Sequence, residues 1–259
     1  MFKNQRQNEI LEMLAKEKFL SVNTIASRLY SSLPTVRRDL TALENAGLVK
    51  RSHGGVMLYE GKESTPVAFR QGKQAGEKGK MAKLAVNMIS DGDLIFFDSS
   101  STVLHLADYI SNFKNITVVT NGLIAAKKFS DAGARVFSTG GRLLAESSAL
   151  VGHSAERTVD EFNADIMFFS AAALSDDGII SDWSEDERNM RLSMAKASKI
   201  KVFLCDSSKF DKKCSFRFGG LSDVDYIVTD KPLHEKIAEK LSLISDSESG
   251  ALLYKMVRE

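Results

Sequence analysis

The sequence of 259 residues has little cysteine and no long apolar run, and both absences limit what the protein can be. Two cysteines, Cys205 and Cys214, are too few for a disulfide framework and suit a reducing compartment. No apolar stretch is long enough to cross a membrane, and the N-terminus shows no apolar leader. We therefore expect a cytoplasmic protein without a membrane partner.

Motifs of catalysis and of cofactor binding are also absent. The four histidines are scattered and lack the spacing of a metal site, so we expect no metal. There is no G-x-S-x-G nucleophile motif, no phosphate-binding P-loop, and no G-x-G-x-x-G after a strand. The acidic run 176–188 has the composition of a solvated loop. We expect neither a catalytic set nor a cofactor.

The net charge of +1 hides an uneven distribution of charge. Residues 1–60 hold nine basic and six acidic residues, whereas the remainder holds 26 basic and 28 acidic residues. The chain is long enough for one large domain or for two. A small basic module joined to a larger, slightly acidic one is typical of a nucleic-acid-binding protein with a separate second domain.

The stretch 32–45 predicts a DNA-recognition helix. Ser32 is a suitable N-cap, and Pro34 suits the first turn. Apolar residues at i, i+4 and i+7 form a stripe that faces a core: Val36, Leu40 and Leu43. The other side carries groups that reach phosphates and base edges in a major groove: Arg37, Arg38, Thr41 and Asn45. An ordinary solvated helix face has the same composition, so this stretch alone does not decide the function.

The segments around this helix predict a winged helix-turn-helix over residues 1–58. Two amphipathic helices, 3–16 and 22–29, precede it, and Gly47 suits its end. Two short strands around Gly54 and Gly55 then form a hairpin. Basic residues on this wing can meet phosphate: Lys50, Arg51 and His53. His53 can equally be a simple turn residue. The polar residues 59–75 read as a linker.

From residue 76 to residue 259 the pattern predicts an α/β domain. Apolar strands are expected at 93–98, 116–121, 134–140, 165–171, 201–206 and 225–230, with a last one within 251–257. Helices are expected at 77–89, 102–110, 123–130, 154–162, 188–198 and 231–241. Continuous apolar strands that alternate with helices indicate a parallel sheet covered on both faces.

Hydroxyls, small residues and free backbone N–H groups follow five of these strands. They lie at 98–102, 120–122, 138–141, 170–173 and 206–209. Ligands of open α/β sheets bind beyond the carboxyl ends of the strands. A helix N-terminus preceded by serines suits a phosphate, Lys209 can add a positive charge, and Asp98 and Asp206 can accept hydrogen bonds from sugar hydroxyls. Turn chemistry explains any one of these loops, but the five together favour a small phosphorylated polyol.

Motifs in both halves resemble those of one family. The N-terminal half contains TVRRDLTALENAGLVKR and HGGVML, and the C-terminal half contains DGDLIFFDSSST, TVVTNGL, STGGRL, GIISDW and LCDSSKF. Along nearly its whole length the chain resembles the DeoR family of bacterial transcriptional regulators. The resemblance implies a sensor domain similar to ribose-phosphate isomerases that binds a sugar phosphate, in a chain that forms dimers or tetramers.

The helix face and the wing give the expected DNA contacts, and the resemblance implies the effector contacts. The expected DNA contacts are Thr35, Arg37, Arg38, Thr41, Asn45, Lys50, Arg51 and His53. The expected effector contacts are Lys78, Asp98, Ser99, Ser101, Thr102, Thr120, Asn121, Gly140, Gly141, Asp182 and Lys209. Trp183 can be a ligand wall, an oligomer contact or a core anchor.

Two positions depart from the family pattern. Where the family usually has a Gly-Ala-Ser-Gly turn, this chain has Ser170 to Ala173, which adds side chains beside the ligand. A position that is usually Lys is Arg191, which keeps the charge but not the geometry. Both changes bear on the identity and size of the effector.

The leading hypothesis is a sequence-specific transcriptional regulator, a repressor of carbohydrate-metabolism genes, whose affinity for operator DNA changes when a sugar phosphate binds. Spacing two recognition helices along DNA requires at least a dimer. The alternative is a sugar-phosphate isomerase with an appended DNA-binding module. The turn from Ser170 to Ala173 lacks a carboxylate to act as general base, which argues against this enzyme. A third hypothesis, a nucleic-acid binder without a ligand, predicts no binding of any sugar phosphate.

Overall fold

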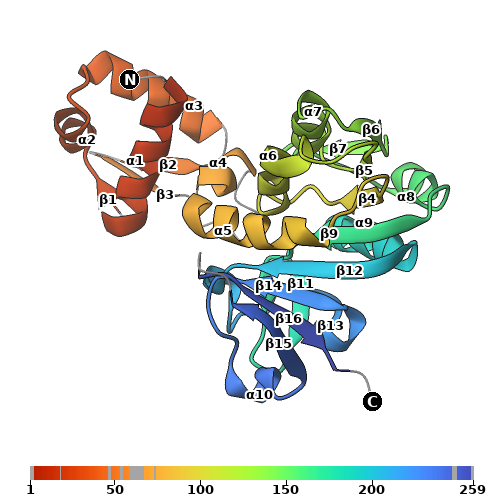
Figure 1. Cartoon of the computed structure of the whole chain (residues 1–259). Coiled ribbons are helices and arrows are strands. Elements are labelled where there is room, and N and C mark those ends of the chain that lie inside the picture. The colour runs from red at the N-terminus through yellow and green to blue at the C-terminus, as the bar shows by residue number, and fades with distance from the viewer. Residues whose placement is uncertain are drawn as a thin grey trace. The chain divides into compact units, whose positions relative to one another are not determined.

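A computed structural model describes residues 3–17, 19–45, 48–52, 55–58, 67–72, 74–246 and 250–257 (Figure 1). The chain divides into two units, Met1–Gly72 and Lys73–Glu259. The stretch 59–75, read as a linker in the sequence, contains helix α4 (Val67–Gly72). Gly47, His53 and Gly54 fall outside the described residues, so the predicted end of the recognition helix and the tip of the wing stay predictions.

The first unit has the helices and the hairpin that the sequence predicts. Its elements are α1 (Lys3–Glu17), α2 (Val22–Arg28), α3 (Leu33–Asn45), β2 (Val49–Ser52) and β3 (Gly55–Leu58). The predicted N-cap Ser32 is present, since its hydroxyl accepts from Thr35 N at 3.4 Å. Ser21 caps α2 in the same way, accepting from Thr24 N at 3.0 Å. The apolar stripe of α3 is buried in a small core with α1 and α2.

A third strand completes this wing. The two-residue strand β1 (Phe19–Leu20) pairs antiparallel with β3, so the sheet order is β1-β3-β2. The sequence does not show this strand, because two residues carry no periodicity. At Gly55 the two strands approach so closely that a Cβ atom would lie 2.5 Å from both the Leu20 carbonyl oxygen and the Phe19 ring.

We expect Gly55→Ala to destabilise the wing by about 1–3 kcal/mol, because the added methyl group overlaps backbone that cannot move away. Faster amide hydrogen exchange in β1 and β3 would report the loss. Gly79→Ala is the control, since a Cβ at that helical position meets no neighbouring atom and is expected to stabilise its helix. Unchanged exchange in Gly55→Ala would contradict the close approach.

The second unit is built around an eight-stranded sheet in the order β15-β16-β14-β12-β9-β4-β5-β6. Its strands are β4 (Leu94–Phe97), β5 (Thr117–Thr120), β6 (Arg135–Ser138), β9 (Ala164–Phe169), β12 (Ser198–Cys205), β14 (Tyr226–Thr229), β15 (Leu241–Asp246) and β16 (Leu252–Met256). The six strands from β14 to β6 are parallel, and they are the six predicted strands between residues 93 and 230. The fold class predicted from the sequence is therefore confirmed.

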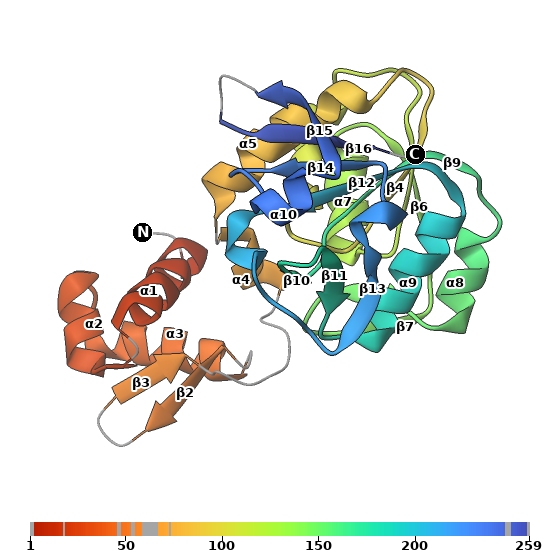
Figure 2. The ribbon, with the colours of Figure 1, turned by 90° about the horizontal axis from the view of Figure 1, so that it is seen from below.

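Helices cover both faces of this sheet. They are α5 (Ala75–Ala85), η1 (Val86–Met88), η2 (Val103–Leu106), α6 (Ala107–Ile110), α7 (Leu123–Asp131), α8 (His153–Val159), α9 (Glu185–Lys196) and α10 (Glu235–Ala238), with short turns η3 (Ser207–Lys209) and η4 (Leu221–Asp223). Helix α7 contacts β5 and β6, whereas α8 and α9 lie side by side near β13 (Phe216–Gly220) (Figure 2). Predicted helix 102–110 is divided between η2 and α6.

The C-terminal part of the sheet differs from the prediction. The expected helix 231–241 is only the short α10, and the chain then forms β15, which pairs antiparallel with β16. Strand β16 in turn pairs antiparallel with β14. The predicted parallel sheet therefore has an antiparallel edge of two strands, of which β15 was not predicted. The strong helix formers of 235–241 suggested a longer helix, and pairing with β16 overrides that preference.

Two small β-structures were also not predicted. Strands β7 (Arg142–Leu144) and β8 (Ala149–Val151) form a hairpin, and β10 (Ala173–Leu174), β11 (Ile179–Asp182) and β13 form a three-stranded antiparallel sheet. All five strands are two to five residues long. Such short strands leave little alternation in a sequence.

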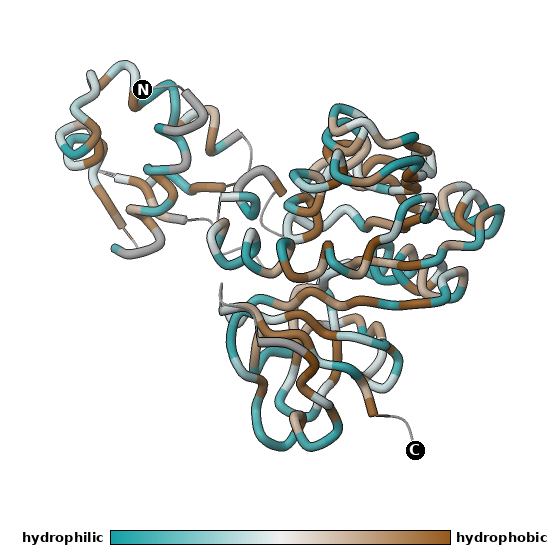
Figure 3. The backbone as a smooth tube through the Cα atoms, viewed as in Figure 1, coloured by the Kyte–Doolittle hydropathy of each residue, from teal (hydrophilic) through white to brown (hydrophobic). Residues whose placement is uncertain are grey.

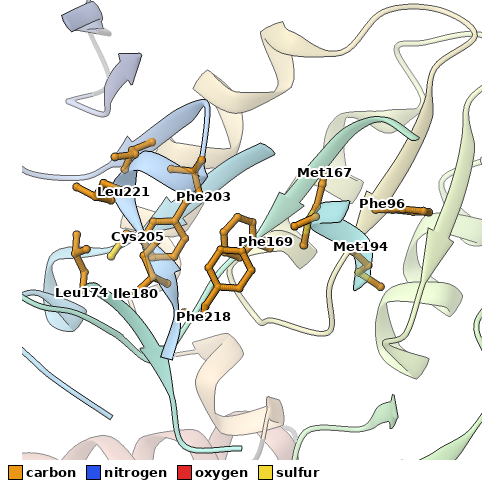
Figure 4. Packing of buried hydrophobic residues seen from close by; sticks show 14 of the residues in the cluster. Phe96, Met167, Phe169, Leu174, Ile180, Met194, Phe203, Cys205, Phe218 and Leu221 are labelled. Atoms are coloured by element: carbon orange, nitrogen blue, oxygen red, sulfur yellow. The ribbon is translucent and has the colours of Figure 1, made fainter. Parts of the chain in front are cut away.

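Aromatic residues fill both sides of the sheet. On one face Phe97 stacks on Phe129 of α7, with the ring centroids 4.1 Å apart. On the other face Phe169 packs against Phe203 and Phe218, beside α8 and α9 (Figure 4). Figure 3 shows hydrophobic segments concentrated in the central strands. In the described part of the chain, no helix is both long enough and apolar enough to cross a bilayer.

Candidate DNA interface and effector site

Helix α3 presents its arginines to solvent. Arg37, Arg38 and Thr41 are exposed, while the stripe on the other side of the helix is buried. Thr35 is half-buried, and its hydroxyl lies 2.8 Å from that of Ser32. Asn45 ends the helix, and its side chain lies outside the described part. The described residues of this face therefore offer two guanidiniums and a hydroxyl to a partner.

The wing brings further cations beside this face. Lys50 and Arg51 are exposed on β2, and Arg51 Nη1 lies 3.4 Å from the Thr41 hydroxyl. The backbone N–H of Arg51 donates to the Glu44 carboxylate at 3.1 Å, which fixes the strand against the end of α3. A groove of about 270 Å³ separates helix and wing, and Arg37 and Arg51 both line it. The structure thus brings Arg51 of β2 beside Arg37 and Thr41 of α3.

Asp39 has a different role from the two arginines that precede it. It is buried and accepts hydrogen bonds from Arg6 Nε and from Gln7 Nε2, both on α1. In the Arg-Arg-Asp sequence, the two arginines are therefore exposed to solvent, whereas the Asp39 carboxylate connects α3 to α1.

The strand order of the second unit creates a switch point. From β4 the chain proceeds to β5 and β6 on one side, whereas from β9 it proceeds to β12 and β14 on the other. The loops 98–102 and 170–173, which follow β4 and β9, therefore lead to opposite sides of the sheet, and Ser170 N donates to Asp98 Oδ2 at 3.3 Å between them. Ligands of open α/β sheets bind at this point, beyond the carboxyl ends of the strands.

A buried ion cluster lies at this switch point. Arg191 on α9 donates from Nε to Asp98 Oδ2 and from Nη1 to Asp182 Oδ2, each at 2.7 Å. All three residues are buried. Burial lowers the pKa of the Arg191 guanidinium, but the carboxylates of Asp182, Asp98 and Glu187 outweigh burial and raise it. The guanidinium stays charged and binds the end of β11 to the end of β4.

Glu187 is part of the same cluster, although it is not among the effector contacts expected from the sequence. It stands three residues after Ser184, the N-cap of α9, where a glutamate commonly turns back to the cap backbone. In the structure its buried carboxylate instead lies 3.4 Å from the Ser99 hydroxyl. The acidic run 176–188 was expected to be a solvated loop apart from Asp182, an expected effector contact. Both Asp182 and Glu187 are buried, so that expectation was wrong for Glu187. Trp183 between them is 45% exposed, which excludes a core anchor.

The far end of the 98–102 loop meets two lysines. Lys78 of α5 donates to the Ser101 hydroxyl at 3.2 Å. Lys209 donates to the Ser170 hydroxyl at 2.6 Å and to the Thr102 hydroxyl at 3.3 Å. Two lysines that are 131 positions apart in the sequence thus donate to the hydroxyls of two consecutive residues of this loop.

Asp206 holds Lys209 near this loop, with 3.5 Å between Oδ2 and Nζ. Burial raises the pKa of the Asp206 carboxyl, but the positive charge of Lys209 and hydrogen bonds from Ser208 outweigh burial and lower it. The ionised carboxylate keeps Lys209 in place beside the loop.

The turn after β5 supplies a neutral acceptor. Asn121 Nδ2 donates to the Leu150 carbonyl at 3.1 Å, whereas its buried Oδ1 has no hydrogen-bond partner among the residues that the structure describes. The Thr120 hydroxyl accepts from Gly122 N at 3.1 Å and shapes the turn. A Cβ at Gly122 would lie 2.9 Å from Ser99 Cα, so this turn packs directly on the 98–102 loop.

Gly140 and Gly141 follow β6, and both have positive φ, 64° and 104°. A Cβ at Gly141 would lie 2.6 Å from the Val151 carbonyl oxygen, so this glycine permits contact with β8. Strand β8 in turn hydrogen-bonds to the Asn121 turn through Leu150 N, at 2.6 Å from Asn121 O. Gly141 therefore contacts the site only through β8, which pairs with the Asn121 turn. A Cβ at Gly140 would meet no atom within 4 Å.

Comparison with known proteins gives the family. The DeoR C-terminal sensor domain matches residues 73–231, and the DeoR-like helix-turn-helix domain matches residues 6–62. The chain belongs to the DeoR family. The resemblance seen in the sequence is thereby confirmed, and this DeoR-family protein is a DNA-binding transcriptional regulator rather than an enzyme.

Curated relatives match over nearly their whole length. The transcriptional repressor AccR of Agrobacterium fabrum is 31% identical over 242 residues, covering 91% of this chain and 94% of that protein. The regulator GlpR of Haloferax volcanii is 32% identical, with 93% and 95% covered. The glycerol-3-phosphate regulon repressor of Escherichia coli is 27% identical, with 90% and 92% covered.

Solved structures show a more distant likeness. Ribose 5-phosphate isomerase A from Neisseria gonorrhoeae superposes with a TM-score of 0.39 at 12% identity, covering 70% of this chain and 75% of that chain. A translation initiation factor eIF-2B from Pyrococcus horikoshii gives a TM-score of 0.46 at 13% identity, with 87% of each chain covered.

Proposed function

We propose that this protein represses genes of carbohydrate metabolism and that a phosphorylated sugar, bound at the carboxyl ends of β4 and β9, changes its affinity for operator DNA. The observation that supports the proposal most strongly is that the two ends of the 98–102 loop have different neighbours. One end faces buried hydrogen-bond acceptors, and the other end faces two lysines. A small molecule with hydroxyls at one end and a phosphate at the other complements this arrangement.

The cationic end suits a phosphate. Lys78 and Lys209 donate to neutral hydroxyls of Ser101, Thr102 and Ser170. A phosphate replaces these contacts, in which only the donor is charged, with hydrogen bonds between opposite charges. The Ser101 and Thr102 hydroxyls can donate to the remaining phosphate oxygens, whereas the Ser170 hydroxyl donates to the Leu204 carbonyl.

The other end suits hydroxyl groups. The Asn121 Oδ1 atom is buried without a donor, and a buried acceptor left unpaired costs about 1–3 kcal/mol. The Glu187 carboxylate has the Ser99 hydroxyl at 3.4 Å. Sugar hydroxyls that donate to these acceptors recover the cost. The name of the glycerol-3-phosphate regulon repressor fits the same ligand class, a small phosphorylated polyol.

Control of DNA binding then follows from linkage. An effector shifts operator affinity only when it binds the DNA-competent and DNA-incompetent states with different affinity. The element that it biases is the spacing of two recognition helices, about one DNA turn or a multiple of it apart. The proposal therefore includes at least a homodimer, working in the cytoplasm.

A thermal-shift panel tests the ligand class. The purified full chain is heated with sugar phosphates, with the matched free sugars, and with inorganic phosphate. A ligand at 100 times its dissociation constant stabilises the folded chain by about 2.7 kcal/mol. We expect a phosphorylated sugar to raise the melting temperature while its free sugar does not. A panel in which no phosphorylated compound shifts the melt would remove the sugar-phosphate proposal.

We expect Lys209→Ala to lower affinity for the phosphorylated effector by about 1.5–3 kcal/mol, because a charge-assisted contact is lost. DNA binding without effector stays intact. Isothermal titration of the full chain measures the loss. Lys212→Ala is the matched control, since Lys212 is exposed and lies three residues away. Equal effector affinity of wild type and Lys209→Ala would place the phosphate elsewhere.

A further inference from the structure

Tyr30 of the helix-turn-helix has an exposed side chain and a strained backbone, and neither stabilises the fold. It lies in the turn between α2 and α3, and 98% of its surface is exposed. Its φ angle is +48°, in the left-handed region that large side chains avoid. The chain thus places a bulky aromatic ring in solvent on strained backbone.

The end of α2 imposes this backbone geometry. Tyr30 N donates to the Ser27 carbonyl at 3.3 Å, and Ser31 N donates to the Ala26 carbonyl at 3.0 Å. This pair of bonds is the usual end of a helix in which glycine occupies the left-handed position. Glycine or asparagine would satisfy the same bonds with less strain. Tyrosine at this position therefore lowers stability, and strained residues of this kind are enriched at functional sites.

The position of the turn indicates what Tyr30 contacts. The turn leads directly into α3, where Ser32, Leu33 and Pro34 are exposed. In helix-turn-helix proteins the first residues of the recognition helix reach the base edges, and the preceding helix crosses the backbone of the duplex. The turn between the two helices thus lies at the edge of the groove, along the sugar-phosphate backbone.

We propose that Tyr30 is a DNA-backbone contact: its hydroxyl donates to a phosphate oxygen and its ring packs on the adjoining deoxyribose. Tyrosine is among the side chains that bind phosphate in protein–DNA complexes. Because phosphate and sugar are the same at every base pair, this contact adds affinity without sequence preference. The inference depends on DNA binding by this unit and not on the identity of the effector.

The test compares Tyr30→Phe and Tyr30→Gly with the wild-type full chain. The probes are a DNA duplex selected by the wild-type protein from a random pool and a duplex of unrelated sequence. Loss of one hydrogen bond predicts that Tyr30→Phe weakens binding of both duplexes by about fivefold. Tyr30→Gly also loses the ring contact and is expected to weaken binding by more than about tenfold. Its unfolding midpoint in urea stays equal to wild type or rises, because glycine relieves the strain.

Asn115→Gly is the matched control, since Asn115 is exposed in the second unit and has φ of +58°. This substitution removes the backbone strain of a residue with positive φ outside the DNA-binding unit, and we expect it to leave DNA affinity unchanged. Three results would overturn the proposal. If both Tyr30 variants bound DNA as tightly as the wild type, Tyr30 would not contact DNA. If Tyr30→Gly had a lower unfolding midpoint than the wild type, the ring would stabilise the fold instead, and if only the selected duplex bound more weakly, Tyr30 would contact a base.

Discussion

Arg191→Met is expected to destabilise the second unit by about 3–5 kcal/mol, because it removes the positive charge that pairs with two buried carboxylates. Asp98 and Asp182 each lose an ion pair of 2.7 Å, and the buried Glu187 loses a favourable electrostatic interaction with the guanidinium. Methionine fills much of the same volume, so the effect reports charge more than packing. Urea unfolding followed by Trp183 fluorescence measures it, since the single tryptophan lies next to Asp182.

Arg191→Lys is the control for this prediction. Lysine keeps the positive charge but cannot donate to both carboxylates through a planar fork. We expect it to retain most of the stability while changing effector affinity. Equal stability of Arg191→Met and wild type would show that the cluster does not hold β4, β11 and α9 together.

Arg38→Ala is expected to weaken binding to the selected operator by about 1–3 kcal/mol, since a guanidinium that reads a base supplies about that much discrimination. Arg38 is exposed on α3, and no hydrogen bond or ion pair within the described unit engages it, so its removal leaves the fold intact. Fluorescence anisotropy at fixed salt measures the loss. A smaller effect on an unrelated duplex would separate base reading from phosphate binding.

Arg28→Ala is the matched control for Arg38→Ala. Arg28 is also exposed in the first unit, but it forms an ion pair with Glu17 of α1. An exposed pair of this kind contributes little to stability, so both stability and DNA affinity should change little. If Arg38→Ala bound the operator as tightly as the wild type does, Arg38 would not belong to the interface.

Much of the fold could be predicted because its elements are periodic and long. The stripe of Val36, Leu40 and Leu43 predicts α3 with its buried side, and the apolar runs predict six parallel strands. The parts that could not be predicted are short or paired with distant segments. Strand β1 has two residues, and β15 depends on β16, which follows it along the chain.

The candidate site shows the same limit. Residues beyond the strand ends, such as Asp98, Asn121 and Lys209, could be selected because topology alone brings strand ends together. Arg191 was noted only through the family resemblance, and Glu187 lies in an acidic stretch, where composition indicates solvent. Their burial follows from the side of α9 that packs on the sheet, which a single sequence does not reveal. The spacing from Ser184 to Glu187 was a usable signal, but it predicts a cap rather than a site.

The most direct test of the central claim is the operator affinity of the full chain, measured with and without the sugar phosphate that gives the largest thermal shift. The account predicts that saturating effector changes this affinity by at least about fivefold in the wild type, a coupling of about 1 kcal/mol, and has little effect at the same concentration in Lys209→Ala. An effector that binds the wild type tightly and leaves operator affinity unchanged would contradict the claim that this site controls DNA binding.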